Sequence, residues 1–251
     1  MEGFLFIDKP AGMTSHDVVD RVRRLTGERR VGHAGTLDPF ATGLLIVGVG
    51  RAATREMQKL VGLDKTYEAV FVLGASSDTD DRTGKITSAP LHNHPFPLLQ
   101  KEGEIEKVLR QFLGEIEQIP PTYSAIKVGG KKMYEAARAG KPIKGTPRKV
   151  RIHAFDIGPI GPIGPITKLQ ANISCSSGTY IRSLARDLGA ALCGGGYVEA
   201  LRRTSTGPFS LSEAHTLEDL PVILPTALIP IPQLLCRLLT TPASSDILHS
   251  V

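Results

Sequence analysis

The predicted strands of this chain do not alternate regularly with helices, and this constrains the fold more than any other feature of the sequence. Strands predicted at Lys149–Ile157 and Thr167–Cys175 follow one another with only a Gly-Pro-Ile repeat between them, and no helix. Antiparallel strands can be joined by short turns, whereas parallel strands need a long crossover. We therefore expect an α+β fold with a mixed, largely antiparallel central sheet, flanked by helices and loops.

Other segments add strands and helices to this pattern. Alternating burial is expected along a strand at Lys65–Gly74, and helical spacing of apolar residues predicts helices that end at a glycine. The further predicted strands are Phe4–Ile7, Tyr123–Val128 and Tyr197–Thr206. The predicted helices begin near Thr14, Glu104, Lys132 and Ser177, and they end at Gly27, Gly114, Gly140 and Gly189.

The charge balance favours a polyanionic partner. The chain has 251 residues, and Lys and Arg outnumber Asp and Glu by 30 to 25. Nucleic acid is the first candidate for a partner of a basic protein. Arginines gather on and after the first predicted helix, at Arg21, Arg23, Arg24, Arg29 and Arg30. They either contact phosphates or form an ordinary solvated face, and both interpretations stay open.

Cysteine usage and the ends of the sequence predict a protein of the cytoplasm. The three cysteines are too scattered for a disulfide framework or a metal site, which indicates a reducing compartment. The start lacks the basic region of a signal peptide. The apolar stretch 221–239 contains four prolines, so we expect that it does not span a membrane. His92 and His94 have no third ligand nearby, and we expect no metal.

One stretch holds a single carboxylate among glycines and apolar residues. From Val31 to Gly50 the only charged residue is Asp38, and Gly35, Pro39 and Gly43 flank it. A glycine-rich apolar loop is a poor element of a core, but it can present a nucleophile or a base. Leu-Asp-Pro also begins many ordinary turns, so the composition alone leaves both interpretations open.

Two motifs and four shorter blocks occur in a recognisable order. The motifs are Asp8-Lys9-Pro10-Ala11-Gly12-Met13-Thr14-Ser15 and Gly32-His33-Ala34-Gly35-Thr36-Leu37-Asp38-Pro39-Phe40-Ala41-Thr42-Gly43. The blocks are Lys65-Thr66-Tyr67, Pro121-Thr122-Tyr123-Ser124-Ala125-Ile126-Lys127, Gly178-Thr179-Tyr180-Ile181-Arg182 and Leu201-Arg202-Arg203. With these, the chain resembles the bacterial tRNA pseudouridine synthases of the TruB type over about residues 4 to 209.

The resemblance implies the pseudouridine synthase fold and the isomerisation of one T-loop uridine of tRNA, conventionally numbered 55, to its carbon-linked isomer. It implies that Asp38 is the nucleophile, that Tyr67 lies against the target base as the acid–base group, and that Arg182 pairs with Asp38. It also implies that His33, Tyr180 and Leu201 contact the extruded nucleotide or the loop around it. No cofactor and no metal are implied.

Physical chemistry supports these roles independently. Breaking and remaking a glycosidic bond requires the base to leave its stack at a cost of a few kcal/mol. Stacking on an aromatic side chain such as Tyr67 returns about 1–3 kcal/mol. An aspartate in an apolar loop needs a guanidinium partner to stay ionised, and Arg182 can supply it. Without the resemblance, Tyr67 and Leu201 would be assigned to the core and His33 to the surface.

The resemblance also predicts the organisation of the chain and its partners. We expect a catalytic domain at residues 1–206 and a short, Pro-rich C-terminal extension at 207–251, reduced relative to the family's usual RNA-binding module. The expected partner is the T-arm stem-loop of tRNA, with no membrane and no obligate protein partner. One alternative is a catalytically silent tRNA-binding or folding chaperone, and another is a hydrolase that uses Asp38. The three residues Asp38, Tyr67 and Arg182 together argue against a silent binder.

Overall fold

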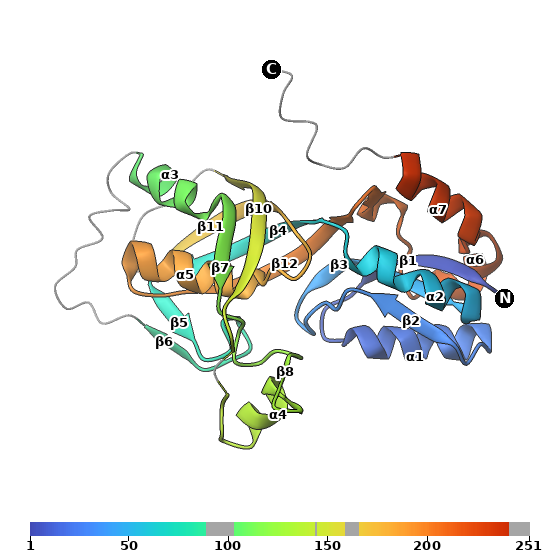
Figure 1. The fold of residues 1–251 in the computed structure, drawn as a ribbon, viewed down its shortest axis with the longest axis horizontal. Coiled ribbons are helices and arrows are strands. Elements are labelled where there is room, and N and C mark those ends of the chain that lie inside the picture. The colour runs from blue at the N-terminus through green and yellow to red at the C-terminus, as the bar shows by residue number, and fades with distance from the viewer. Residues whose placement is uncertain (89–102, 144, 159–165, 241–251) are drawn as a thin grey trace. The chain divides into compact units, whose positions relative to one another are not determined.

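The computed structural model describes residues 1–88, 103–143, 145–158 and 166–240, and it divides into two compact units (Figure 1). Unit 1 comprises Met1–Lys65 and Arg202–Val251, and unit 2 comprises Thr66–Leu201. The chain therefore passes from unit 1 to unit 2 after Lys65 and returns to unit 1 at Arg202. The Gly-Pro-Ile repeat at 159–165, His92 and His94 lie outside the described residues.

Unit 1 is built on the strand β3, which has neighbours on both edges. β1 runs antiparallel to β3 along its whole length, from Gly3 opposite Val49 to Lys9 opposite Gly43. β2 is antiparallel to the later part of β3, and β12 pairs in parallel with its beginning, where Arg203 lies opposite Gly43. The strands are β1 (Gly3–Lys9), β2 (Val31–Ala34), β3 (Thr42–Val49), β12 (Gly196–Thr206) and β13 (Phe209–Ser210).

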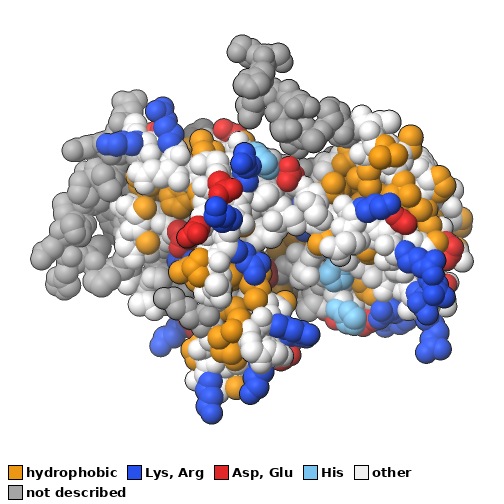
Figure 2. Space-filling view, viewed as in Figure 1, with side chains coloured by type: hydrophobic (Ala, Val, Ile, Leu, Met, Phe, Trp, Pro, Cys, Tyr) orange, Lys and Arg blue, Asp and Glu red, His pale blue; other side chains and the backbone are white. Residues whose placement is uncertain are grey.

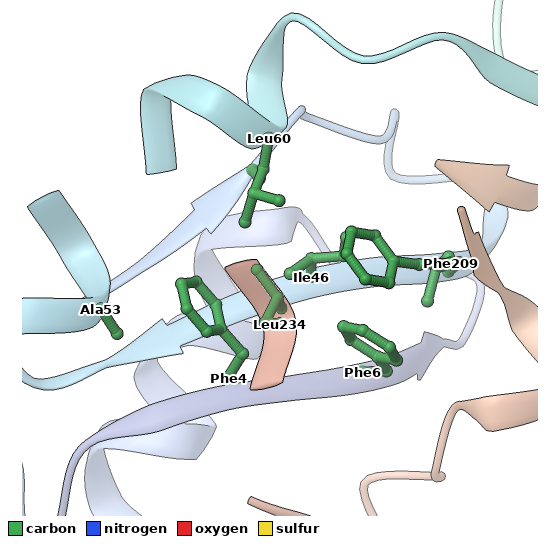
Figure 3. Close-up of a cluster of buried hydrophobic side chains, with 9 residues drawn as sticks. Phe4, Phe6, Ile46, Ala53, Leu60, Phe209 and Leu234 are labelled. Carbon is green, nitrogen blue, oxygen red and sulfur yellow. The ribbon is translucent and has the colours of Figure 1, made fainter. Parts of the chain in front are cut away.

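Helices complete unit 1, and the C-terminal ones fill its core. Phe4, Phe6, Ile46, Phe209 and Leu234 are almost fully buried in one cluster (Figure 3). Leu234 comes from the last described helix, and the backbone before that helix pairs with β1 through Phe4 and Ile229. The helices are α1 (Ser15–Thr26), α2 (Gly50–Val61), η2 (Leu211–Glu213), α6 (Leu220–Ala227) and α7 (Ile231–Thr240).

Unit 2 contains the larger share of the antiparallel pairing. Its strand order is β12-β4-β11-β10-β7, and β10 is antiparallel to both β11 and β7. The strands of this sheet are β4 (Lys65–Leu73), β7 (Gly114–Gln118), β10 (Arg148–Ile157) and β11 (Thr167–Cys175). Two hairpins add β5 (Ala75–Ser77) with β6 (Ile86–Ser88) and β8 (Lys127–Val128) with β9 (Lys131–Lys132). The helices are α3 (Glu104–Leu109), η1 (Arg110–Phe112), α4 (Met133–Arg138) and α5 (Ile181–Cys193).

The expected mixed, mostly antiparallel α+β fold is confirmed, and two local predictions within unit 2 are wrong. The predicted strand Tyr123–Val128 is irregular except for its last two residues. The helix α5 continues through Gly189 and ends at Gly194, whose φ of 82° is the left-handed conformation of a helix C-cap. Gly189 is glycine for another reason, since a Cβ there would lie 2.3 Å from the backbone of Gly195.

No helix among the described residues combines the length and the apolar character needed to cross a bilayer.

Candidate functional site

Asp38 lies on a short loop between two paired strands. The predicted loop from Val31 to Gly50 is wrong, because β2 and β3 occupy most of it and only residues 35–41 connect them. Within this connection Asp38 is half-buried. Gly35 begins this connection and Gly43 follows it as the second residue of β3. Their φ values of 82° and 102° are ones that residues with a side chain rarely adopt. The carboxylate is therefore presented by a tight turn anchored in the sheet.

The first sequence motif holds this loop in place. The backbone N–H of Gly12 donates to the carbonyl of Pro39 at 2.8 Å, next to Asp38. Ser15 Oγ accepts from the N–H of Leu37 at 2.9 Å and donates to its carbonyl at 3.2 Å. Residues 8–15 thus brace the Asp38 loop from both sides of the aspartate.

A buried lysine lies behind the same loop. Lys9 has no exposed surface, and its Nζ donates to the carbonyls of Met13 at 2.7 Å, Pro10 at 2.8 Å and Pro39 at 3.4 Å. Burial lowers the pKa of Lys9 from 10.5 to about 8, although the charge of Asp38 opposes this shift. Lys9 was not singled out in the sequence, where it was only one letter of the first motif.

Two consecutive arginines of β12 fasten the ends of the loop. Arg203 is 1% exposed, and it donates from Nε to the carbonyl of Leu44 at 2.7 Å and from Nη2 to that of Gly35 at 3.0 Å. Arg202 forms a two-pronged ion pair with Asp8, at 2.6 and 3.1 Å, and donates to Thr42 at 3.2 Å. Arg203 therefore holds the backbone on both sides of the Asp38 loop, and Arg202 links the side chains of Asp8 and Thr42.

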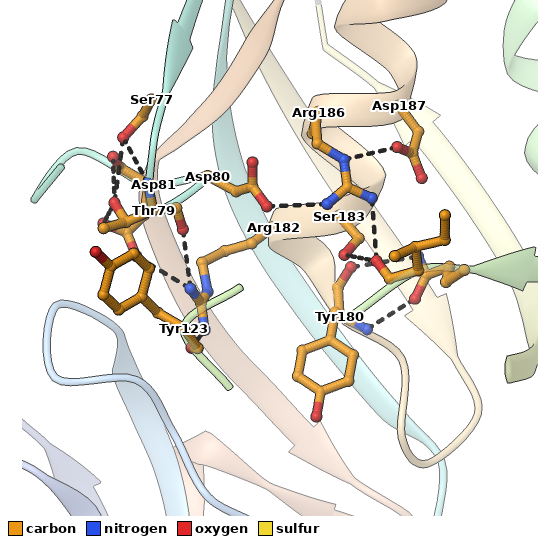
Figure 4. A network of polar contacts seen from close by, with 12 residues as sticks. Ser77, Thr79, Asp80, Asp81, Tyr123, Tyr180, Arg182, Ser183, Arg186 and Asp187 are labelled. Atoms are coloured by element: carbon orange, nitrogen blue, oxygen red, sulfur yellow. Dashed lines mark hydrogen bonds and ion pairs between the residues drawn. The ribbon is translucent and has the colours of Figure 1, made fainter. Parts of the chain in front are cut away.

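Arg182 lies in unit 2, in the first turn of α5. It is 4% exposed, and its guanidinium donates to the carbonyls of Thr79 at 2.9 Å and Tyr123 at 3.0 Å (Figure 4). Asp81 lies 3.6 Å from Nη1. These acceptors offset the unfavourable position of a cation at a helix N-terminus. No sequence signal distinguishes Asp81, because the segment that contains it has only the composition of a polar loop.

The remaining predicted residues divide between the two units. Tyr67 on β4 and Leu201 on β12 are both buried, at 8% and 7% exposure. Tyr180 is half-buried before α5, its backbone N–H donates to Gln118 Oε1 at 3.0 Å, and the Arg148 guanidinium lies 5.8 Å from its ring centroid. Asp38 and His33 thus belong to unit 1, whereas Tyr67, Tyr180, Arg182 and Leu201 belong to unit 2.

His33 lies on β2, close in sequence to Asp38. Its Nδ1 atom is buried and has no hydrogen-bond partner among the described residues. Burial, followed by the nearby charge of Arg203, lowers the pKa of His33 below its usual 6.5. The lowered pKa favours the neutral imidazole at pH 7.

Within the part of the chain that the structure describes, no three His, Cys, Asp or Glu side chains are grouped to hold a metal ion.

Comparison with known proteins gives consistent matches along the chain. The N-terminal domain model of the TruB family of pseudouridylate synthases matches residues 23–181, and the C-terminal domain model of tRNA pseudouridylate synthase B matches residues 182–227. The tRNA pseudouridine synthase B of Arthrobacter sp. (strain FB24) is 48% identical over 88% of this chain and 71% of its own length. The one from Thermobifida fusca is 48% identical over 87% of this chain and 74% of its own length.

Solved structures give more distant matches. The chain aligns with a Cbf5-Nop10-Gar1 complex with a TM-score of 0.62 and 30% identity, over 87% of this chain and 53% of that chain. It aligns with an H/ACA RNP bound to a substrate RNA containing 2'-deoxyuridine with a TM-score of 0.61 and 28% identity, over 87% and 52%. The chain therefore spans about half the length of these solved chains.

Proposed function

The chain belongs to the TruB family of pseudouridylate synthases, and we propose that it isomerises the T-loop uridine 55 of tRNA with Asp38 as the nucleophile. It is a tRNA pseudouridine synthase and thus an isomerase. The assignment of Asp38 rests on the way in which its loop is held. The backbone on both sides of this half-buried carboxylate is bonded to the first motif, to Lys9 and to Arg203.

The proposed reaction needs one carboxylate and one pocket for an extruded base. The bond from the sugar C1′ to the ring nitrogen breaks, and a bond from C1′ to a ring carbon forms. That carbon loses its proton and the nitrogen gains one, so no electrons are gained or lost. Asp38 forms a bond to the nucleotide early in the reaction, and this bond breaks again once C1′ is joined to the ring carbon, which regenerates the carboxylate. Arg182 pairs with this carboxylate, and Tyr67 packs on the base and moves the proton.

His33, Tyr180 and Leu201 are proposed to contact the extruded nucleotide and the loop around it. A neutral His33 supports this role, because an uncharged imidazole stacks on bases or apolar groups without the cost of removing a charge from water. Tyr180 has its backbone fixed by Gln118, so its ring enters the contact at little further loss of conformational freedom.

Exposed arginines on unit 1 support binding of the RNA backbone. Lys and Arg side chains gather beside α1 and α2 (Figure 2), where Arg24, Arg29, Arg30, Arg51 and Arg55 are exposed. The N–H of Gly50 donates to the carbonyl of Arg30 at 2.8 Å, which joins the end of one arginine group to the start of the other. Phosphate contacts of this kind supply affinity and position but no sequence information.

The substrate, the partners, the location and the domains of the enzyme are also part of what we propose. A T-arm stem-loop is the substrate recognised, no protein partner is required, and the enzyme acts in the cytoplasm. Residues 1–206 form the catalytic domain, and residues 207–251 form a C-terminal extension.

The test is release of tritium from a T-arm stem-loop labelled at C5 of its uridines. The wild-type protein should release label, and replacing U55 by cytidine in the RNA should prevent release. Asp38→Asn should abolish turnover and leave binding largely intact, whereas Asp20→Asn, which removes a half-exposed carboxylate on α1, should have no effect. Normal turnover by Asp38→Asn would show that Asp38 is not the nucleophile. Binding without release by the wild type would favour the silent chaperone.

A further inference from the structure

Two arginines of α5 face two consecutive aspartates of the loop after β5. Arg182 lies 3.6 Å from Asp81, and Arg186, one helical turn later, lies 3.0 Å from Asp80. The Arg186 guanidinium also donates from Nη2 to the carbonyl of Ile119 at 3.0 Å and from Nε to Asp187 Oδ1 at 2.9 Å, so its position is set from three sides (Figure 4). The helix spacing of four residues puts both arginines on one face of α5.

The backbone of Asp80 makes this double contact possible. Its φ is 60°, and it is the only residue other than glycine with a positive φ in the described ranges. Side chains alternate between two sides along an extended segment, and a left-handed residue breaks that alternation. The segment is fastened to β12, since Val198 donates to the Asp80 carbonyl at 3.1 Å and accepts from Arg82 at 2.9 Å. The carboxylates of Asp80 and Asp81 therefore both reach α5.

Asp81 has one carboxylate oxygen to offer an arginine. Its Oδ1 accepts from Thr79 Oγ1 at 2.8 Å, from the N–H of Thr83 at 2.9 Å and from Thr83 Oγ1 at 2.5 Å. Its Oδ2 is the atom that faces Arg182. Without Asp80, Arg186 would keep Asp187 at Nε, but its Nη1 would lose a carboxylate and compete for this oxygen. Without Arg186, Asp80 would compete for the guanidinium of Arg182.

We propose that Asp80 and Arg186 are positioning residues. Because they pair with each other, Asp81 stays paired with Arg182, and the Arg182 guanidinium is held in the position that the reaction needs. The inference rests on the catalytic role of Arg182 in the proposed function. Burial raises the pKa of Asp80, and the charges of Arg186 and Arg182 oppose that shift. The ion pair with Arg186 thus counteracts the burial of the Asp80 carboxylate and occupies Arg186 at the same time.

The test compares two single variants with the double variant on the T-arm stem-loop. Asp80→Asn keeps a residue that tolerates a positive φ and removes the charge. Arg186→Gln removes the other charge. Each single variant should lower kcat about tenfold with KM unchanged, because the lost contact between Asp80 and Arg186 leaves one of the two charged groups to compete for Asp81 or for Arg182. The double variant, in which neither competitor remains, should recover kcat to within about threefold of the wild type.

Two further variants separate this inference from the proposed function. Glu213→Gln breaks another arginine–carboxylate pair, to Arg237 at 2.6 Å in unit 1, and should leave kcat unchanged. Arg182→Lys should lower kcat strongly, because an ammonium cannot keep all the contacts of a planar guanidinium. Unchanged kcat in Arg182→Lys would refute the role of Arg182 and, with it, this inference.

If Arg182→Lys is impaired, two results would overturn the inference alone. One is a double variant whose loss of kcat is the product of the two single losses. The other is a pair of single variants that lower the melting temperature but keep the wild-type kcat well below it, because this would show that the pair only anchors the loop.

Discussion

Gly43 carries the closest backbone approach in the candidate site, and replacing it by alanine should be costly for two separable reasons. Its φ is 102°, and a Cβ built there would lie 2.3 Å from the carbonyl oxygen of Arg203 and 2.7 Å from its N. Ordinary Cβ contacts begin at 3.4 Å, so β3 and β12 would have to separate by about 1 Å at this point. That movement would displace the residue that holds the Gly35 carbonyl.

Two other glycines provide matched controls for the separate costs. Gly62 has a φ of −74° and no atom within 4 Å of the position that a Cβ would take, so Gly62→Ala should change the unfolding free energy little or raise it by about 0.5 kcal/mol. Gly12 has a φ of 87° and equally free space, so Gly12→Ala should cost only the left-handed strain, about 1–2 kcal/mol. Gly43→Ala adds the backbone clash and should cost at least about 3 kcal/mol.

Urea unfolding followed by far-ultraviolet circular dichroism measures this series, since the chain has no tryptophan. The midpoints should fall in the order Gly62→Ala, Gly12→Ala, Gly43→Ala, with the slopes unchanged. A Gly43→Ala variant that loses no more stability than Gly12→Ala would refute the reasoning. Such a result would mean that β3 and β12 adapt to the extra methyl group at no cost.

Three further predictions concern buried residues of unit 1. Folding lowers the pKa of Lys9 from 10.5 to about 8, so the unfolded chain binds this proton more tightly than the folded chain does. Between pH 7 and 10 the unfolding free energy of the wild type should therefore rise by about 2–3 kcal/mol relative to that of Lys9→Met. Parallel pH curves from urea titrations would contradict this. The lowered pKa of His33 predicts that below pH 6.5 the wild type loses stability faster than His33→Gln in the same titrations, and equal slopes would count against it. Leu234→Ala should cost about 2–4 kcal/mol in thermal melts, whereas Leu239→Ala, at an 88% exposed position, should change stability by less than about 0.5 kcal/mol. Similar losses would mean that α7 does not complete the core.

Local signals were sufficient to predict several elements. Thr14 and Asp17 form a capping box at the start of α1, and Gly27 ends it in the left-handed conformation, as the residue types indicate. The alternation after Lys65 gives β4, whose residues alternate between buried and more exposed over its first half. In both cases the determining interactions lie within one element, so the sequence pattern is enough.

Long-range contacts explain where the predictions failed. The run from Val31 to Gly50 has the glycine content of a loop, but β3 within it is paired on both edges and buried along nearly its whole length. A strand of that kind loses the alternation by which strands are recognised. Gly189 resembles a helix stop, yet its small size serves the contact with Gly195, which only the folded chain reveals.

In the candidate site, too, local sequence patterns identify some residues but not the long-range contacts that hold them. The sequence motifs supplied Asp38, Tyr67 and Arg182 through a resemblance, and they did not reveal which residues hold these side chains. Arg203 contacts Gly35 across 168 positions, and Lys9 contacts Pro39 across 30. No local pattern predicts contacts of such separation, although both residues lie in the quoted motifs.

Lys9 and Arg203 also place two buried side chains that carry cationic groups around the turn that holds Asp38. Both cations are buried and donate to backbone carbonyls, an arrangement that stabilises a fold poorly, because removing charge from water costs several kcal/mol. The Coulomb attraction between Lys9 and Asp38 favours the charged form of both groups. An apolar lysine replacement would relieve the desolvation cost but lose the three carbonyl contacts and this attraction. We therefore expect Lys9→Met to affect activity more than stability. At pH 7 its turnover should fall by more than its loss of unfolding free energy accounts for, because Lys9 and Arg203 serve the placement and charge of Asp38 more than the stability of unit 1.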